Sequence, residues 1–336
     1  MSMTLRQLAD KINVAPSTVS RALSNNSGVS EVRAREIRQL ADKLGYRPKP
    51  LRRSMNKTLG LLVSSDFPKE PDDTYQSNLI AAALEQVGRA GWHLHFEVIP
   101  RGNNHSKLVR ENRVDGVLLC GFPSQKLCDE LLKIRMPAVA LDDLAMRTGL
   151  SSVVADVSFG TEQVVKRLRA MGHERIAMIA TADAFPTVAA RVDGYRRAIA
   201  DLHQEDDLLA FAGYSTIQQG QIATRQLMER CERPTAFIYA TDCLAVGGMI
   251  EFGRMGLRVP EDVSIAGHDN TSLARDMEPA LTSVDLHLPR MIDVAVSMLR
   301  EHIARDSDEV MEPLQKKIEV QTIWRNSCGP APQSDS

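Results

Sequence analysis

The feature that most constrains the fold is an alternation of short apolar runs with helical stretches, which begins at Thr58 and continues almost to the end of the chain. Such alternation predicts an α/β fold with parallel, doubly wound sheets. About 270 residues are too many for one small sheet, so two α/β lobes are expected. Ligands of such sheets bind beyond the carboxyl ends of the strands, which places a site in the cleft between the lobes. The predicted strands span residues 59–63, 92–99, 114–120, 137–141, 176–180, 236–239, 263–266 and 318–325.

The amino-terminal residues follow a different, purely helical pattern. Leu5, Leu8 and Ile12 recur at helical spacing, and Asn13 tolerates the left-handed backbone of a tight turn. Pro16 suits the first position of a second helix that ends near residue 23. Two helices joined by so short a turn form a helix-turn-helix, whose second helix fits the major groove of DNA. A third helix is capped by Ser30 and has an apolar stripe of Val32, Ile37, Leu40, Ala41 and Leu44.

Charge supports a nucleic-acid partner for this segment alone. The formal net charge of the chain is −2, yet residues 1–57 carry 12 Lys and Arg residues against 4 Asp and Glu residues. The remainder of the chain is therefore acidic. A basic segment on an acidic body predicts that only the segment meets a polyanion, with a merely solvated charged surface as the alternative.

Within the helix-turn-helix, each side chain suits a particular kind of contact. The guanidinium of Arg21 can hold guanine with two hydrogen bonds, which makes it the best candidate for reading bases. Pro16 and Ser17 lie at the start of the second helix, where base edges come close. The other candidates suit phosphates, which fix register without carrying sequence information; they are Thr18, Ser20, Ser24, Ser30 and Arg33.

These residues also carry a resemblance. The stretch from Leu5 to Leu23 with its Thr18-Val-Ser-Arg21 core, the Val29-Ser30 pair and the Leu44-Gly-Tyr-Arg-Pro48 exit are similar to the headpiece of the lactose-repressor (LacI/GalR) family. The resemblance extends to about Ser327. It implies a hinge helix after the headpiece and adds Tyr46, Lys49 and Met55 to the DNA contacts, with Met55 as an apolar wedge in the minor groove. Two departures stand out: Ala15 replaces a serine cap, and Arg52 replaces a small residue of the hinge.

The resemblance also implies an effector site. The family's body is similar to periplasmic sugar-binding proteins, with two lobes joined by crossing segments. Carboxylates accept hydrogen bonds from sugar hydroxyls, arginine donates to oxygen, and an aromatic face covers a sugar ring. Each candidate has a structural alternative: a helix cap for the aspartates, a surface ion pair for the arginine and a core position for Tyr214. The residues at matching positions are Tyr75, Asp142, Arg191, Tyr214, Thr241 and Asp269, while Asp242 is expected to cap the helix that starts near Cys243.

Several classes are disfavoured by what the sequence lacks. No apolar run approaches the roughly 18 residues of a membrane span, and the first residues lack the apolar core of a secretory signal, so the cytoplasm and the nucleoid are the expected location. The five cysteines form no CxxC pair, so neither a disulfide framework nor a zinc site is expected. No Gly-rich phosphate loop, GxSxG elbow or HExxH motif appears, so no cofactor and no catalytic residue is predicted.

The predicted molecule is thus a homodimeric regulator of transcription. Two recognition helices related by a twofold axis would read a near-palindromic operator, and a sugar-like effector in the cleft would control operator affinity. The expected target is a set of carbohydrate-catabolism genes. The alternatives are a nucleobase effector, a solute-binding protein and a nucleotide-dependent enzyme. The expected domains are a headpiece at 1–47, a hinge at 48–57, a body at 58–327 with lobes 58–155 plus 286–315 and 156–285 plus 316–327, and a disordered tail at 328–336.

Overall fold

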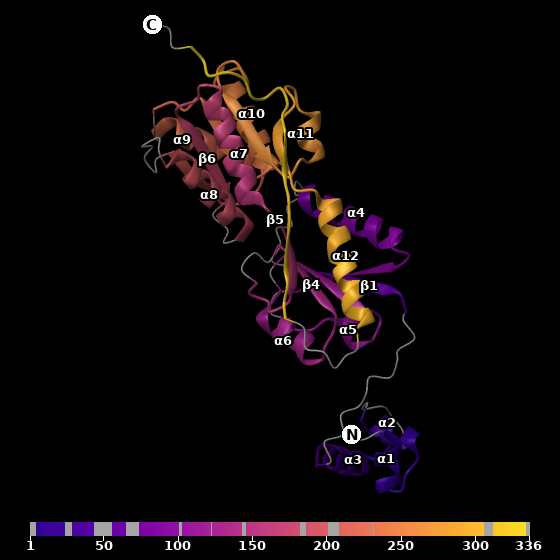
Figure 1. Ribbon diagram of the computed structural model, residues 1–336. Coiled ribbons are helices and arrows are strands. Elements are labelled where there is room, and N and C mark those ends of the chain that lie inside the picture. The colour runs from indigo at the N-terminus through magenta and orange to yellow at the C-terminus, as the bar shows by residue number, and fades with distance from the viewer. Residues whose placement is uncertain are drawn as a thin grey trace. The chain divides into compact units, whose positions relative to one another are not determined.

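A computed structural model shows two compact units, Met1–Met55 and Asn56–Ser336, which are described separately. The second unit contains two lobes (Figure 1). No helix in the described part of the chain is long and apolar enough to cross a membrane. The structure describes residues 5–23, 29–43, 56–64, 74–100, 103–121, 123–142, 146–181, 186–200, 208–230, 232–305 and 312–333.

The first unit is a small helical bundle around an apolar core. Its helices are α1 (Leu5–Lys11), α2 (Pro16–Leu23) and α3 (Glu31–Lys43). The stripe predicted on α3 is partly wrong, because Val32 is 72% exposed. The helix instead turns small residues inward, which lets it pack closely against α2. The buried core residues are Leu8, Ala9, Val19, Ala22, Ala34, Ile37 and Ala41.

The second unit is built on two six-stranded sheets of the predicted doubly wound type. The strand orders are β11-β5-β4-β3-β1-β2 and β12-β10-β9-β8-β6-β7, and every pairing is parallel except that of β10 with β12. Each sheet reverses its order beside its first strand, which is where such sheets bind ligands. The first sheet contains β1 (Thr58–Ser64), β2 (His93–Ile99), β3 (Gly116–Cys120), β4 (Ala138–Leu141), β5 (Ser151–Ala155) and β11 (Gln315–Ile318). The second contains β6 (Ile176–Thr181), β7 (Leu209–Ala212), β8 (Ala236–Tyr239), β9 (Ser264–His268), β10 (Thr282–Asp285) and β12 (Gln321–Ile323).

Helices cover both faces of each sheet. Alternate residues of the buried strands face opposite layers, so Leu61 packs with α4 and α12 while Leu62 packs with α5 and α6. In the second lobe, Met178 faces α7 and α8, and Ile179 faces α9 and α10. The helices are α4 (Thr74–Arg89), α5 (Lys107–Arg110), α6 (Gln125–Lys133), α7 (Val157–Ala170), α8 (Pro186–Ile199), α9 (Ile217–Arg230), α10 (Asp242–Arg254), α11 (Ser272–Asp276) and α12 (Leu288–Ala304).

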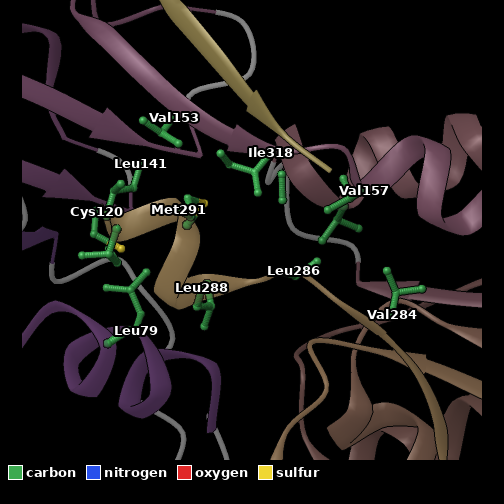
Figure 2. Packing of buried hydrophobic residues seen from close by; sticks show 14 of the residues in the cluster. Leu79, Cys120, Leu141, Val153, Val157, Val284, Leu286, Leu288, Met291 and Ile318 are labelled. Atoms are coloured by element: carbon green, nitrogen blue, oxygen red, sulfur yellow. The ribbon is translucent and has the colours of Figure 1, made fainter. Parts of the chain in front are cut away.

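The chain crosses between the lobes three times: from β5 to α7, from β10 to α12 and from β11 to β12. The single last strand predicted at 318–325 is therefore wrong. It is two strands in different sheets, separated by residues 319 and 320, because an apolar run alone does not show where a chain changes sheet. One apolar core continues through the crossings, where Val157, Leu286 and Ile318 lie between the lobes (Figure 2).

The expectation of a disordered tail from Cys328 onward is wrong for residues 328–333. The backbone of Gly329 is held by two side chains: its carbonyl accepts from His173 Nε2 at 3.0 Å, and its N–H donates to Ser264 Oγ at 3.0 Å. The N–H of Ala331 donates to the carbonyl of Met171 at 2.9 Å. The composition of the tail indicated disorder, but these hydrogen bonds tie it to the second lobe.

Helices α7 and α8 meet at a glycine, which gives a test of the packing. A Cβ at Gly194 would lie 2.2 Å from the carbonyl oxygen of Ser158, whereas a Cβ at Gly253 on α10 would meet nothing. Gly194→Ala should therefore force the helices apart and lower the free energy of unfolding by about 1–3 kcal/mol or more. Gly253→Ala should leave it equal or raise it by roughly 0.5–1 kcal/mol. Urea unfolding of both variants measures the difference, and equal midpoints would contradict this packing.

Candidate functional site

The first unit has the geometry of a helix-turn-helix. Residues 12–15 connect α1 to α2, and Asn13 takes the left-handed backbone (φ 52°) that the turn requires. The carbonyl of Ala15 accepts from the N–H of Thr18 at 2.9 Å, which starts α2 without a side-chain cap. Val19 is fully buried, so one face of α2 packs into the core and the opposite face is turned outward.

The outward face begins with the predicted contact residues. Pro16 and Ser17 are exposed and Thr18 is half-buried. Ser20 and Arg21 lie on α2, but their side chains are outside what the structure describes, and so are the predicted contacts Ser24, Tyr46, Lys49 and Met55, together with Arg52 of the hinge.

Ser30 and Arg33 lie at the start of α3. The Ser30 hydroxyl accepts from the N–H of Arg33 at 3.4 Å, in agreement with its predicted role as a cap. The exposed Arg33 guanidinium donates to Glu36 at 2.7 Å and to the carbonyl of Ile12 at 3.5 Å. Arg33 therefore lies beside the α1–α2 turn, where a phosphate would compete with Glu36 for it.

In the first lobe, the candidate effector residues form one pair. Asp142 follows β4 with a left-handed backbone (φ 62°), and the hydroxyl of Tyr75, on α4, donates to its Oδ2 at 2.5 Å. Burial raises the pKa of the Asp142 carboxyl, and the Tyr75 hydroxyl and the Arg191 charge oppose that rise. Among the described residues, the Oδ1 atom of Asp142 has no hydrogen-bond donor.

In the second lobe, Arg191 and Asp269 form a buried ion pair. Arg191 Nη2 donates to Asp269 Oδ1 at 2.8 Å, and the two side chains are 5% and 6% exposed. Arg191 Nη1 donates to the carbonyl of Ala240, at the end of β8, and its buried Nε finds no acceptor among the described residues. Burial raises the pKa of Asp269, while the neighbouring guanidinium lowers it.

The two pairs lie within electrostatic range of each other. Both Arg191 and Asp269 act on the Asp142 carboxyl, and Asp269 also contributes to the strong rise in the pKa of Tyr75. Tyr75, Asp142, Arg191 and Asp269 are called the interlobe site below. Asp142 and Asp269 directly follow strands β4 and β9, where the strand-end rule predicts ligand-binding residues, whereas Tyr75 and Arg191 come from helices α4 and α8.

Two other candidates are not joined to this site by any described contact. The side chain of Thr241 caps α10: it accepts from the N–H of Leu244 at 3.3 Å and bonds Ser215 Oγ at 2.6 Å. Tyr214 is 57% exposed, so the alternative of a core residue is wrong for it. Asp242 is not the cap that the sequence predicted, because Thr241 takes that position.

Asp242 is instead the centre of a buried network that the sequence did not reveal. Its Oδ2 accepts from the N–H and the hydroxyl of Thr271 at 2.8 and 2.9 Å, and its Oδ1 accepts from Ser283 at 2.7 Å. Burial, with the nearby Asp269 charge, raises the pKa of Asp242 to about 7. The network fixes the turn after Asp269, and its partners are too far apart in sequence to show a pattern.

His268 and Arg325 also support the Asp269 turn. His268 is buried between Thr161 Oγ1 (2.9 Å) and the carbonyl of Tyr239 (2.8 Å), and burial lowers its pKa to about 3, so it is neutral. Arg325 donates to Asn270 Oδ1 at 2.5 Å. No group of three or more His, Cys, Asp or Glu side chains in the described ranges could hold a metal ion.

A helical DNA-binding unit joined to a two-lobed α/β body defines a class, that of ligand-binding DNA-binding regulators. Family models match both parts: residues 4–49 match the bacterial regulatory proteins of the lacI family, and residues 165–328 match the periplasmic binding protein-like domain. Residues 4–49 therefore form a DNA-binding domain of the lacI family, and residues 165–328 form a periplasmic binding protein-like domain in the same chain. The chain is a DNA-binding regulator of transcription and not an enzyme, as the sequence predicted.

The chain is similar to known repressors and to solved structures over almost its whole length. It is 26% identical, over 99% of its length and 98% of the relative, to the HTH-type transcriptional repressor PurR of Escherichia coli O139:H28 (strain E24377A / ETEC). It is similar to the transcriptional regulator CelR in complex with cellobiose (26% identity, 97% and 99% of the two chains, TM-score 0.69). The lac repressor dimer bound to operator and the anti-inducer ONPF shares the fold at 22% identity, 98% and 100% coverage and a TM-score of 0.70.

The buried Asp242 carboxyl predicts how stability changes with pH. Its folded pKa of about 7 exceeds the value of about 4 in an unfolded chain, so between these values the folded protein holds a proton that the unfolded chain releases. The contribution of Asp242 to the free energy of unfolding should therefore rise as pH falls from 8 to 5.5, by up to about 1.4 kcal/mol per pH unit.

Asp242→Asn should lack this contribution, because the amide does not titrate. Urea unfolding of the wild-type chain and the variant at pH 8, 7 and 5.5 measures it. Asp129→Asn, at an exposed position on α6, is the control and should keep the wild-type dependence. The same pH dependence in Asp242→Asn and in the wild type would show that Asp242 does not titrate in this range.

Proposed function

We propose that the chain is a homodimeric transcriptional repressor whose affinity for a near-palindromic operator is controlled by a sugar-like effector bound at the interlobe site. The observation that carries the proposal is the convergence of two carboxylates that follow strands with a tyrosine and an arginine from helices of the two lobes, in a chain whose first unit is a helix-turn-helix. The proposed target is a set of carbohydrate-catabolism genes, and action on chromosomal DNA implies a cytoplasmic, nucleoid-associated protein.

The chemistry of the interlobe site favours a polyhydroxy ligand. A carboxylate can accept hydrogen bonds from neighbouring hydroxyls, and a guanidinium can donate to ring or hydroxyl oxygens. The similar regulator CelR was solved with cellobiose, and another of similar fold, from Enterococcus faecium, with ribose. A nucleobase effector is the second candidate, because the chain is equally similar in sequence to the repressor PurR.

In this proposal, the first unit reads DNA as half of a dimer. One short recognition helix contacts too few bases for a unique site, so two helices on half-sites about one helical turn apart would be needed. Three residues of this helix would approach base edges: the exposed Pro16 and Ser17, and the predicted contact Arg21. The proposed phosphate and hinge contacts are Thr18, Ser20, Ser24, Ser30, Arg33, Tyr46, Lys49 and Met55. The proposed domains remain the headpiece at 1–47, the hinge at 48–57 and the body from 58.

Operator binding tests the DNA half of the proposal. An operator selected from genomic DNA by binding to the full chain is titrated with wild type and with Arg21→Ala by fluorescence anisotropy at fixed salt. Arg21→Ala should weaken specific binding by about 1–3 kcal/mol and relax the base preference at one position of each half-site. Arg300→Ala removes the same charge from an exposed position on α12 and should bind as wild type. Unchanged specific affinity in Arg21→Ala would contradict its role.

The effector half is tested by Asp269. Asp269→Asn removes the partner of the Arg191 charge and should abolish the change in operator affinity on addition of effector, because the effector then loses its ligand-binding carboxylate. Operator affinity without effector should stay within a few-fold of wild type, since the DNA-binding unit is unaltered. A full effector response in the variant would rule out the interlobe site.

Thermal-shift screening of carbohydrates and nucleobases identifies the effector, since a ligand at 100 times its Kd adds about 2.7 kcal/mol of stability.

A further inference from the structure

The first unit ends at Met55 and the body begins at Asn56. Asp115, the residue directly before β3, holds the start of the body. Its Oδ1 accepts from the N–H of Asn56 at 3.3 Å, and its Oδ2 accepts from the N–H of Thr58 at 3.1 Å. One carboxylate therefore binds two backbone groups of residues 56–58, which are called the entry segment below.

Other hydrogen bonds of the entry segment fix its path. The N–H of Asp115 donates to the carbonyl of Thr58 at 2.8 Å, and the N–H of His93, at the start of β2, donates to the carbonyl of Lys57 at 2.7 Å. Lys57 takes the left-handed backbone (φ 51°), which residues other than glycine adopt infrequently. The turn at Lys57 is therefore held from both sides, by the start of β2 and by Asp115.

The Asp115 carboxylate is well suited to anchor this segment. It precedes β3, an inner strand whose five residues are all buried, so its own backbone is firmly placed. Asp115 is 9% exposed and Thr58 is 6% exposed, so their hydrogen bonds lie mostly out of water. Without the carboxylate, the N–H groups of Asn56 and Thr58 would lose their acceptors, which is unfavourable in a buried place. Asn56 and Lys57 would regain hydrogen bonds with water by detaching from the body.

The length of the freed chain decides how such a release would affect DNA binding. An extended residue spans about 3.3–3.6 Å, so the release of Asn56 and Lys57 would lengthen the connection to the DNA-binding unit by up to about 7 Å. One added base pair moves a half-site by about 3.4 Å and turns it by about 35°. The freed length is therefore larger than the displacement that one base pair causes.

We propose that Asp115 is a positioning residue for operator binding: it fixes where the connection to the DNA-binding unit begins, and thereby the half-site spacing that the dimer accepts. This inference rests on the proposed function, because spacing matters only to a dimer on two half-sites. It makes a separate claim about the body, which involves neither the effector nor a contact with DNA. Asp115 acts through the backbone of Asn56 and Thr58.

The experiment measures how strongly operator affinity depends on half-site spacing. An operator selected from genomic DNA by the full chain is prepared in three forms: as selected, and with one base pair inserted or deleted at its centre. Full-length wild type and variants are titrated with each form by fluorescence anisotropy at fixed salt. Wild type should bind the selected form at least about tenfold more tightly than either altered form.

Asp115→Ala removes both acceptors and should narrow this ratio to about threefold or less, because the longer free chain accommodates the altered spacing. Asp115→Asn keeps one acceptor and should give an intermediate ratio. A ratio of affinities does not depend on the folded fraction, so a loss of stability alone leaves it unchanged.

Ser151→Ala is the matched control. Ser151 is the first residue of β5, at the same end of the same sheet, and its Oγ accepts from the N–H of Leu314 at 3.2 Å. The variant therefore loses a hydrogen bond to backbone outside the entry segment. It should keep the wild-type ratio.

Hydrogen exchange measures the anchor itself. In peptides that cover the start of β1, the amides of Asn56 and Thr58 should exchange at least about tenfold faster in Asp115→Ala than in wild type. Peptides from β6, in the second lobe, should exchange at the wild-type rate.

The outcomes separate the two claims. Faster exchange in Asp115→Ala with an unchanged spacing ratio overturns the positioning role and leaves the dimeric repressor intact. Unchanged exchange at Asn56 and Thr58 overturns the anchor. Equal binding of all three operator forms by wild type overturns the dimer on two half-sites, and the positioning role with it.

Discussion

The buried ion pair between Arg191 and Asp269 is the interaction on which the interlobe site depends. It fixes the end of β9 against α8, and through the carbonyl of Ala240 it also holds the end of β8. Removing one partner of such a pair leaves an uncompensated charge in a region almost without solvent, which typically costs several kcal/mol. The hydrogen bonds of Asp242 with Thr271 and of His268 with the carbonyl of Tyr239 support the Asp269 turn in this geometry.

The three segments that cross between the lobes could transmit a change at the interlobe site to the rest of the second unit. One apolar core continues from the first lobe through all three crossings into the second. The crossings are also tied by polar contacts: the N–H of Asp156 donates to the carbonyl of Ile318 at 2.9 Å, and Lys317 pairs with Asp156 at 3.1 Å. A ligand that bonds residues of both lobes would favour one arrangement of these crossings over another, and a difference in affinity between two arrangements is all that allosteric control requires.

Much of the fold was predictable because burial leaves a clear pattern in parallel strands. The strand at 236–239 was predicted residue for residue, and most of the others to within two residues at each end. Three strands were missed, β5, β7 and β10, because their apolar content is low or their runs are short. The crossing at residues 319 and 320 and the ordered tail depend on contacts between distant segments, which no local pattern reports.

The site was predictable to a similar extent. The rule that ligands lie at strand ends, together with the family resemblance, led to Asp142, Arg191 and Asp269, which the structure brings together. The role of Tyr75 as the partner of Asp142 and the Asp242 network depend on tertiary geometry, and the sequence gives no signal for either. Thr241 was predicted to contact the effector, but its side chain caps helix α10. A polar residue directly before a helix commonly serves as its cap, so position alone does not indicate a ligand contact.

In the proposed mechanism, a ligand at the interlobe site and an operator at the first unit are thermodynamically linked. The most direct test is to measure the Kd of the effector twice by calorimetry, for the free chain and for the chain saturated with operator. Linkage predicts two values that differ by about 5–150-fold, and by the same factor as the change in operator affinity when the effector is present. Equal effector affinities in the two states would show that the two sites are not linked, however tightly the effector binds.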